Sequence, residues 1–464
     1  MSDNTPPDNS PPGGKRHRLI NPTVWDYMEA VSLQKFYGGY QIVEMDPNIF
    51  NLGIGEVANI PSTSDLYQLY TSYMQGEALE PKATRYAGTL GERETNAAVA
   101  GHLNQWLGND RLDEMRVVSL DGGHNAVEVA IRVFTSPLGS PDSEKNYVLV
   151  ASPTYPYISS IVSAHAGLMS FLAYDGESFT RGVETYCNPR VGLIIVNVPH
   201  NPLGYALDAA QVARINHIAA AYDCAILVDC VYANFPADEG VGTALGQLDP
   251  ERTVYVDSFS KKYGLPGLRI GFAASPAQEL TFAMRFVKMG ESLTPSTGKL
   301  AFAGHLLREY PHYPEHIGRT VRLRRDRFLE RFDPAALPGV RVLGGADNPF
   351  YMALDISGIC RESGRNDIEV SEYLLERFNL KVFPGSFVYP NTALPHSEFG
   401  RVGRLNPHGQ TPYFPPEVPN GAQIVFAPNL AAERISMLRL SFGTETRVEG
   451  AAEALTEGLR TLCR

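Results

Sequence analysis

The sequence predicts an α/β fold, in which a large domain surrounds a mainly parallel central sheet and a smaller α+β domain follows it. Two observations lead to this prediction. Between about residues 85 and 275, short runs of Val, Ile and Leu alternate with stretches of helical spacing. From about residue 320 this alternation gives way to a mixed pattern. At 464 residues, the chain is also long enough for more than one hydrophobic core.

Apolar runs in the first region are expected to be strands, because each is short and is bounded by polar residues, Gly or Pro. They are Arg116–Leu120, Tyr147–Ala151, Leu193–Val198, Ala225–Asp229 and Thr253–Asp257. Helical spacing fills the intervals between them, as at Val127, Ala130, Val133 and Phe134. Strands that are apolar on both faces form a parallel sheet covered by helices on both sides. Ligands of such sheets bind beyond the carboxyl ends of the strands.

Composition and pattern divide the rest of the chain. Residues 1–19, rich in Pro, Asp, Asn and Ser, are expected to form a disordered tail and no secretory signal. Residues 20–65 are expected to pack with the smaller domain. The large domain is expected to span 66–315, and the small domain 316–464.

Within the small domain, the pattern predicts one helix and two strands. The helix is Val370–Phe378, and the strands are Val382–Val388 and Leu438–Phe442. Between the two strands, at about 389–433, lies a long stretch rich in Pro, Gly and Asn. A loop of this length inside a compact domain is usually functional or disordered.

Charge and cysteine usage exclude several classes of function. The net charge of −11, with no long basic run, argues against nucleic acid as a partner. No apolar run approaches the roughly 18 residues that a membrane span needs. The five cysteines are scattered, with no CxxC pair and no spacing typical of a metal site. Free thiols in the cytoplasm are therefore the expected state.

The segment Ser258-Phe259-Ser260-Lys261 follows the last predicted strand of the sheet and precedes Arg269. A lysine in a turn rich in hydroxyls suits an amine that forms an imine with an aldehyde cofactor. Arg269 and the two serines are close enough in sequence to hold a phosphate. Taken alone, an exposed lysine in a turn would also explain the pattern. The next residue, Lys262, is expected to point to the other side of the turn, into solvent.

Two other strand ends carry candidate groups for the same ligand. Gly122, Gly123 and His124 follow a strand and open a helix, so their backbone N–H groups can face an anion. A plain tight turn explains the glycine pair equally well. Tyr155 lies between Thr154 and Pro156, where its ring can lie flat against a bound aromatic ring. A core tyrosine is the alternative.

The two central strands end in polar groups. Asn201 is held between two prolines and can donate a hydrogen bond to a phenolate-like oxygen, while His200 is expected to be structural. Asp229 ends a buried strand, and a buried carboxylate needs a cationic partner. A protonated pyridine nitrogen is such a partner, and Tyr232 would share the oxygen with Asn201. Capping a helix is the other common role of an aspartate at this position.

Taken together and in this order, these residues resemble the fold-type-I pyridoxal-phosphate enzymes, in particular the class I/II aminotransferases. The resemblance runs from about Asn51 to the C-terminus. It rests on the motifs GGHNA, PTYP, NVPHNPLG, DCVY, SFSKKYGLPGLRIG and LRLSFG. It implies the fold of the pyridoxal-phosphate-dependent transferases, with pyridoxal 5'-phosphate as cofactor. The small-molecule substrate would be an amino acid.

The resemblance also implies a role for each candidate residue. Lys261 would bind the cofactor as a Schiff base, Asp229 would pair with the ring nitrogen, and Tyr155 would stack on the ring. Asn201 and Tyr232 would hold the ring oxygen. The phosphate would be held by Gly123, His124, Ser258, Ser260 and Arg269.

Further roles implied by the resemblance concern the substrate and a second subunit. Arg439 would bind the substrate carboxylate, and Gly55 would lie on the substrate side. Tyr86 would reach the phosphate of the neighbouring subunit in a homodimer with shared active sites. The stretch at 389–433 is then an insertion, which we hypothesise covers or shapes the substrate side. A surface elaboration or a dimer contact is the alternative.

The expected activity is therefore that of an aminotransferase. The alternative is another pyridoxal-phosphate reaction in specialised biosynthesis: elimination or replacement, oxidation, or carbon–carbon bond formation, for example on a substrate like S-adenosylmethionine. The motifs that contain Lys261, Asp229 and Arg439 do not separate these reactions. A pyridoxal-phosphate-sensing regulator is not expected, because the N-terminal tail is too short for a DNA-binding domain.

Overall fold

A computed structural model describes most of residues 46–463. The parts left out are residues 59, 77–83, 139–144, 156, 158–160, 162–163, 165, 234–239, 345–348, 390–423 and 427–434. The expected tail at 1–19 and most of the predicted insertion lie outside the described residues. Nearly all of the expected sheet and the candidate site residues lie within them.

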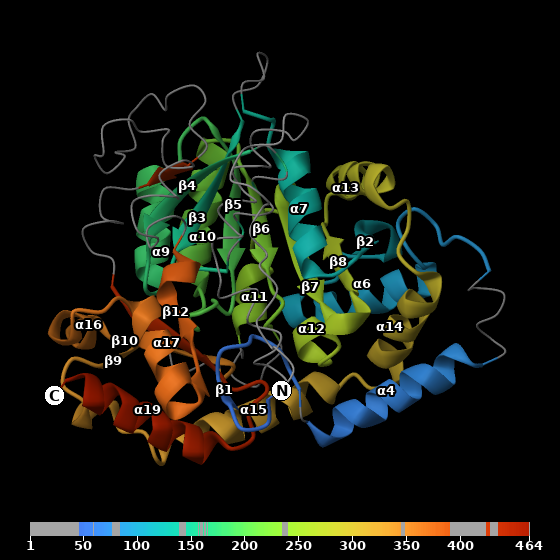
Figure 1. Cartoon of the computed structure of the whole chain (residues 1–464). Helices are drawn as coiled ribbons and strands as arrows, with labels where there is room; N and C mark the ends of the chain where they lie inside the picture. Colours follow the sequence, from blue (N-terminus) through green and yellow to red (C-terminus); the bar gives the residue numbers. More distant parts are fainter. Residues whose placement is uncertain are drawn as a thin grey trace, which may run out of the picture.

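A central sheet of eight strands forms the larger part of the described molecule (Figure 1). Its strands are β2 (Val117–Leu120), β3 (Tyr147–Ser152), β4 (Gly167–Leu172), β5 (Val191–Asn197), β6 (Ala225–Asp229), β7 (Thr253–Ser258), β8 (Gly271–Ala274) and β13 (Ile424–Phe426). Their spatial order is β13-β4-β3-β5-β6-β7-β8-β2. All neighbours are parallel except β8, which is antiparallel to both β7 and β2. The predicted α/β class is confirmed.

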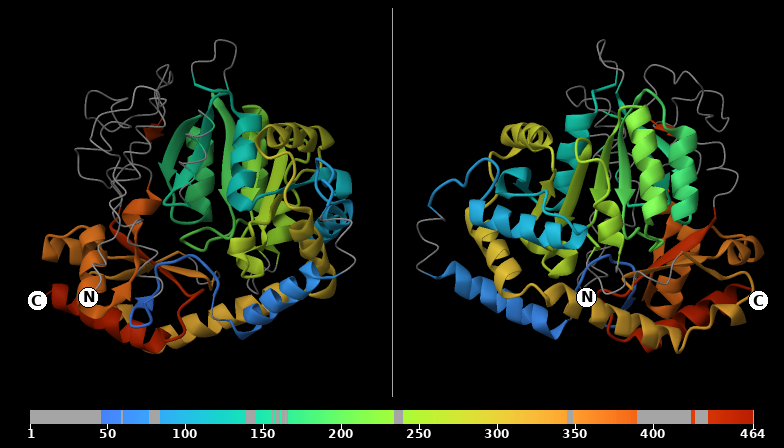
Figure 2. Two further views of the ribbon diagram at one scale, coloured as in Figure 1. Left: turned by 45° about the vertical axis from the view of Figure 1, so that its right-hand side comes forward. Right: turned by 180° about the vertical axis from the view of Figure 1, so that it is seen from behind.

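Helices cover both faces of this sheet, as Figures 1 and 2 show. They are α6 (Arg93–Leu107), α7 (Gly123–Phe134), α9 (Gly176–Tyr186), α10 (Ala209–Ala221), α11 (Val241–Leu245), α12 (Phe259–Lys262), α13 (Gln278–Glu291) and α14 (Thr297–Glu309). Alternate residues of each strand enter different cores, because side chains of a strand alternate between its faces. On β5, Leu193 and Ile195 pack in the core that contains residues of α7. Ile194 and Val196 pack in the core that contains residues of α6, α9 and α10.

A smaller unit with its own hydrophobic core adjoins one end of the large sheet. An antiparallel sheet runs in the order β12-β14-β10-β9 and consists of β9 (Arg341–Leu343), β10 (Tyr351–Asp355), β12 (Phe383–Pro384) and β14 (Met437–Ser441). A short parallel pair joins β1 (Phe50–Asn51) to β11 (Leu380–Lys381). The helices of the unit are α15 (Tyr313–Leu329), α16 (Ser357–Ser363), α17 (Asp367–Phe378) and α19 (Val448–Leu462), and α4 (Pro61–Met74) precedes the large sheet.

The N-terminal segment lies beside the C-terminal elements (Figure 2). Leu52 accepts a hydrogen bond from the backbone of Ser441, and Asn51 donates one to the Glu445 carboxylate at 2.7 Å. The buried guanidinium of Arg324 on α15 donates to the carbonyls of Ala58, Phe442 and Gly443, which ties the same segments together. The segment Gly53–Gly55 is thereby fixed against the smaller unit.

Two predicted features of the small domain differ from the structure. Only Phe383–Pro384 of the predicted strand Val382–Val388 is strand, and Gly385–Val388 is a 3-10 turn. The proline ends the pairing because it has no N–H to donate. Within the predicted insertion, Ile424–Phe426 forms β13 and pairs with β4 at an edge of the large sheet. Three apolar residues are too short a run to be recognised as a strand from sequence.

The state of the cysteines and the length of the helices relate to two expectations: free thiols and the absence of a membrane span. All five cysteines lie in the described part of the chain and are free. The Cys187 and Cys224 sulfur atoms lie 3.4 Å apart. None of the helices in the described ranges is long and apolar enough to cross a membrane.

Candidate active site

Three neighbouring strands bring polar residues to one edge of the sheet. β5 ends at Asn197, β6 at Asp229 and β7 at Ser258. The register pairs Asn197 with Asp229, and Asp229 with Val256. Because these strands are parallel, their carboxyl ends meet at the same edge, where ligands of open α/β sheets bind.

Lys261 projects from α12, the helical turn that follows β7. Its ammonium nitrogen donates to the carbonyl oxygen of Gly55. Burial lowers the pKa of Lys261 to about 8; the positive charges of Arg439 and Arg269 act in the same direction, while Glu56 and Asp229 oppose the shift. At pH 7 about a tenth of this amine is therefore uncharged, far more than for an exposed lysine, and the uncharged form is the one that reacts with an aldehyde.

Asp229 is a buried carboxylate with few partners. The hydroxyl of Tyr157 donates a hydrogen bond to its Oδ2 at 2.5 Å, and the backbone of Val231 lies 3.4 Å from its Oδ1. Burial raises the pKa of Asp229 to about 6, and the negative charge of Asp257 adds to the shift. The hydrogen bonds and Lys261 oppose it. No ion pair to Asp229 is formed within the described part of the chain, so the carboxylate is suited to a cation supplied by a ligand.

Arg439 on β14 lies between two aromatic rings. Its guanidinium carbon is 4.7 Å from the ring centre of Tyr351 and 4.1 Å from that of Phe383. Nη2 donates to the carbonyl of Gly53 at 2.9 Å, and Nη1 lies 3.5 Å from Oδ1 of Asn201. Nε is buried and has no hydrogen-bond partner among the described residues. Stacking fixes the plane of a guanidinium that still has donors free for a carboxylate.

Tyr232, Asn201 and Gly55 lie around Arg439 and Lys261. The hydroxyls of Tyr232 and Tyr351 are 2.6 Å apart, and both rings are buried. The backbone of Asn201 donates to Oδ1 of Asn197 at 2.7 Å, which fixes the turn after β5. A methyl group on Gly55 would lie 2.4 Å from the Tyr351 hydroxyl. The close approach of this backbone to the tyrosine therefore requires glycine.

A cationic cradle lies where the turns after β2 and β7 meet. Gly122 caps α7 with a φ of 95°, and a methyl group there would lie 2.6 Å from Nη2 of Arg269. A methyl group on Gly123 would lie 3.7 Å from Oγ of Ser258. Among the described residues no side chain caps α7 at Gly122, and the first N–H groups of a helix favour the binding of an anion.

The other residues of the cradle have distinct environments. Arg269 donates to the carbonyls of Pro266 and Asp121, and within the described chain it forms no ion pair with a carboxylate. Ser260 is buried, and its backbone donates to Oγ of Ser258 at 3.4 Å. Nδ1 of His124 lies 3.4 Å from the Tyr155 hydroxyl, and burial lowers the pKa of His124. A neutral imidazole at this position adds no charge to the cradle.

These groups fit pyridoxal phosphate. The cofactor has an aldehyde, a basic ring nitrogen and a phosphate. The structure offers a lysine of lowered pKa, a buried carboxylate that forms no ion pair with the described residues, and a glycine-lined helix start beside an arginine. The distribution of charge in the site therefore matches that of the cofactor.

One predicted residue lies apart from this cluster. Tyr86 is 83% exposed, and among the described residues its side chain makes no hydrogen bond. The carbonyl of the preceding Arg85 accepts a hydrogen bond from Thr297 at 3.1 Å. The segment is thus held against the start of α14, and the ring of Tyr86 faces outward.

The expectation that Lys262 is solvated is wrong. Its side chain is buried and forms an ion pair with the buried carboxylate of Asp257. Consecutive residues of a helical turn point in different directions, and the side of α12 opposite Lys261 is the protein core. Asp257, four residues after the strand begins, makes this burial possible by supplying the opposite charge.

Sequence reasoning missed Tyr157, Tyr351 and Phe383. Tyr157 lies two residues after Tyr155, and the other two lie on strands of the smaller unit. Each resembles an ordinary core aromatic residue in its local sequence. Only the tertiary fold brings them next to Asp229 and Arg439.

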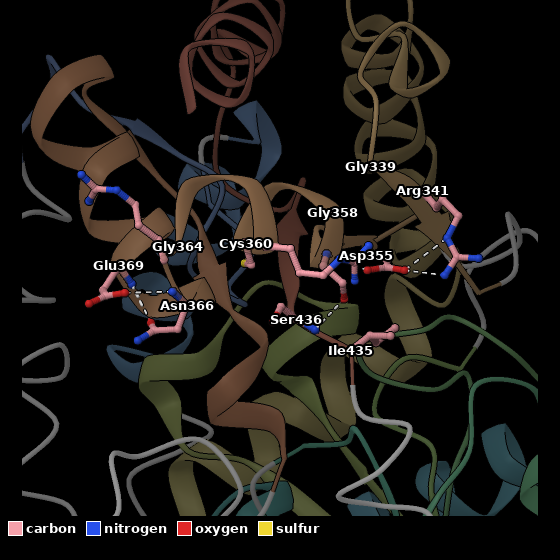
Figure 3. Close-up of a pocket in the computed structure, with 13 residues that line it drawn as sticks. Gly339, Arg341, Asp355, Gly358, Cys360, Gly364, Asn366, Glu369, Ile435 and Ser436 are labelled. Carbon is pink, nitrogen blue, oxygen red and sulfur yellow. Dashed lines mark hydrogen bonds and ion pairs between the residues drawn. The ribbon is translucent and has the colours of Figure 1, made fainter. Parts of the chain in front are cut away.

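A separate pocket lies on the smaller unit (Figure 3). Arg341, Asp355 and Asn366 are among the residues that line it. Nη2 of Arg341 pairs with Oδ2 of Asp355 at 2.6 Å, and Asn366 forms a capping box with Glu369 on α17. Arg341 and Asp355 thus pair with each other, Asn366 and Glu369 cap α17, and none of the candidate site residues lines the pocket.

The fold is that of a pyridoxal-phosphate-dependent enzyme, and the cluster around Lys261 suits the same class of protein. The sequence model of the family aminotransferase class I and II matches residues 47–407. The chain therefore belongs to this family and is a pyridoxal-phosphate-dependent aminotransferase, as predicted.

Individual relatives support this assignment. The chain is 27% identical over 369 residues to aromatic-amino-acid aminotransferase 2 of Thermococcus litoralis. The aligned region covers 78% of this chain and 89% of that protein. The chain is 25% identical over 369 residues to an aspartate aminotransferase of Pyrococcus abyssi, with the same coverage. The crystal structure of an aspartate aminotransferase from Thermotoga maritima superposes with a TM-score of 0.71 at 17% identity, covering 95% of this chain and all of that one. The likeness to this last protein concerns the fold alone.

Proposed function

We propose that Lys261 is the residue that binds the aldehyde of pyridoxal phosphate and that the cluster around it is the aminotransferase active site. The observation that carries the proposal is the position of its amine, which contacts Gly55 and interacts electrostatically with both Arg439 and Asp229. The pKa of this amine is lowered to about 8. No other described lysine combines these neighbours.

The remaining side chains have complementary proposed roles. Asp229 faces the ring nitrogen and keeps it protonated, while Asn201 and Tyr232 hold the ring oxygen and Tyr155 stacks on the ring. The N–H groups of Gly123 and His124 hold the phosphate. Ser258, Ser260 and Arg269 complete the phosphate site.

Bound pyridoxal phosphate supplies an electron sink for the carbon that loses its proton. The chain supplies the binding and the proton transfer. Arg439 binds the α-carboxylate of the amino acid through its free donors, which orients the Cα–H bond. Lys261, whose lowered pKa favours the neutral amine, would accept the Cα proton of the amino acid and later donate it, so that one side chain would serve as both base and acid. The carbonyl of Gly55 holds the Lys261 amine, and the absence of a side chain on Gly55 lets Tyr351 lie against this backbone.

Borohydride reduction tests the position of the covalent bond. The protein is incubated with pyridoxal phosphate, reduced, digested and analysed by mass spectrometry. Modification of Lys261 with its neighbour Lys262 unmodified is the expected result, because Lys262 is buried in an ion pair. Modification of another lysine would refute the assignment.

A single-turnover experiment then identifies the amino donor. Aromatic and dicarboxylic amino acids are the first candidates, since relatives are named aromatic-amino-acid and aspartate aminotransferases. Conversion of the cofactor to pyridoxamine phosphate, together with the matching keto acid, is the expected result. Loss of the substrate with the cofactor still in its aldehyde form would contradict transamination of that amino acid.

We also propose that the protein is a cytoplasmic homodimer with shared active sites, in which Tyr86 reaches the partner's phosphate. The exposed ring of Tyr86 beside α14 supports the dimer, and the five free cysteines support a reducing compartment. The separate cores support the proposed division into a large domain at 66–315 and a small domain at 316–464. Sedimentation of the wild type, and cofactor affinity of Tyr86→Phe, test the dimer and the role of Tyr86.

A further inference from the structure

The buried hydrogen bond between Tyr157 and Asp229 connects the turn after β3 with the end of β6. The Tyr157 hydroxyl donates to Oδ2 of Asp229 at 2.5 Å, and the two side chains are 2% and 5% exposed. Among the described residues, Tyr157 is the side chain that donates a hydrogen bond to this carboxylate. The other contact, from the backbone of Val231, is longer at 3.4 Å.

The surroundings of Asp229 would otherwise favour a neutral carboxyl group. The carboxylate of Asp257 on the neighbouring strand and the burial itself both disfavour its charge, while Lys261 favours it. Tyr155 and Tyr232 are the other titratable groups that act on Tyr157, and burial raises its pKa well above the ordinary value for tyrosine. The hydroxyl therefore remains protonated near neutral pH and can donate to the ionised Asp229.

We infer that Tyr157 is a positioning residue, whose hydroxyl orients the Asp229 carboxylate toward the ring nitrogen of the cofactor and holds it in its ionised form. This inference rests on the proposed function, in which Asp229 faces that nitrogen. A hydrogen bond donated to a carboxylate stabilises the charged form, and the bond fixes Oδ2 so that the carboxylate cannot turn away.

The same tyrosine also contacts the residue proposed to stack on the ring. The rings of Tyr155 and Tyr157 meet edge to face, with their centres 5.1 Å apart. The backbone N–H of Tyr157 donates to the carbonyl of Tyr155 at 2.7 Å. One residue thus links the group proposed to stack on the cofactor ring with the group proposed to pair with its nitrogen.

Cofactor affinity of Tyr157→Phe tests the inference. The affinity of the cofactor-free protein for pyridoxal phosphate is measured between pH 5 and 9, and again with an analogue in which CH replaces the ring nitrogen. The variant keeps the ring and loses only the hydroxyl. Its affinity for pyridoxal phosphate is expected to fall about two- to tenfold at pH 7, because loss of a charged hydrogen bond moves the Asp229 transition upward by about one pH unit or more. Affinity for the analogue is expected to be unchanged.

Tyr255→Phe is the matched control. It removes another buried tyrosine hydroxyl, which donates to the carbonyl of Leu245 at 3.0 Å. This variant is expected to bind both compounds as the wild type does. Equal losses by Tyr157→Phe for both compounds would show a merely structural role and overturn the inference, as would no loss for either.

Asp229→Asn separates the inference from the function on which it rests. If this variant loses affinity for pyridoxal phosphate while Tyr157→Phe does not, the inference fails and the proposed site stands. If Asp229→Asn binds pyridoxal phosphate as tightly as the wild type, Asp229 does not pair with the ring nitrogen, and both are overturned.

Discussion

Replacing Lys262 with methionine removes the partner of a carboxylate that is 1% exposed. Oδ1 of Asp257 keeps the hydrogen bond from the backbone of Ser258 at 2.7 Å, but Oδ2 loses its cation. The folded variant can avoid a bare buried charge by binding a proton on Asp257. With an unfolded pKa of about 3.9, holding that proton at pH 7 costs about 4 kcal/mol. Measured losses for broken buried ion pairs, about 3–5 kcal/mol, are of the same size.

The sign of the pH dependence follows from the proton count. Burial already raises the pKa of Asp257 in the wild type, with Lys262 opposing the shift. In Lys262→Met that opposition is lost, so above pH 4 the folded state holds a proton that the unfolded state lacks. Stability of the variant therefore falls relative to the wild type by up to about 1.4 kcal/mol per pH unit as the pH rises. The deficit at pH 5 is expected to be about 1.5 kcal/mol.

Urea unfolding followed by circular dichroism measures this effect. Cofactor is removed and protein concentration is held constant, because binding and association both shift apparent stability. The control is the double variant Asp257→Asn, Lys262→Met, which has no ionisable group left in the pair and is expected to recover most of the loss. If the single and double variants are equally stable at pH 7, or if their difference does not change with pH, the reasoning is refuted.

Three further predictions concern the site. Arg439→Lys removes both the stacking and the fork of donors, so kcat/KM for the amino donor is expected to fall about 10- to 100-fold, while far-UV circular dichroism stays unchanged. Gly122→Ala places a methyl group 2.6 Å from a guanidinium nitrogen of Arg269, on backbone with a φ of 95°. The variant is expected to bind pyridoxal phosphate more weakly and to lose about 1–3 kcal/mol in stability. Wild-type affinity would contradict the proposal that the cradle holds the phosphate. The rate at which cofactor-free protein condenses with pyridoxal phosphate is expected to rise with pH to a midpoint near 8, the pKa of Lys261, because only the neutral amine reacts; a midpoint near 10 would contradict the burial effect.

The residues proposed to bind the cofactor could be identified in the sequence because they follow strand ends. Asp229 and Lys261 each come after an apolar run, and parallel topology brings such positions together without knowledge of side-chain contacts. No such rule identifies the residues proposed to bind the substrate. Arg439 and Gly55 were identified only through the resemblance to a family.

Other features depend on tertiary contacts that leave no local pattern. Tyr157 reaches Asp229 across 72 residues of sequence, and Tyr351 reaches Tyr232 across 119. The burial of Lys262 depends on the charge of Asp257 and on the direction in which one helical turn points its side chain. The residues next to Lys262 in the sequence are those expected around an ordinary exposed lysine. Hydrophobic periodicity predicts which face of an element is buried, but it does not identify the polar partners that meet inside.

The attachment of the N-terminal segment has a consequence for synthesis. The bond between Asn51 and Glu445 joins residues 394 positions apart, and the carbonyls of Gly53 and Gly55 contact Arg439 and Lys261. Domains fold as the chain emerges, at about 5–20 residues per second, so this segment waits roughly 20–80 s for its partners. The groups around Asp229 can assemble while translation continues. The wall that is proposed to contact the amino acid is completed only when β14, which carries Arg439, has left the ribosome.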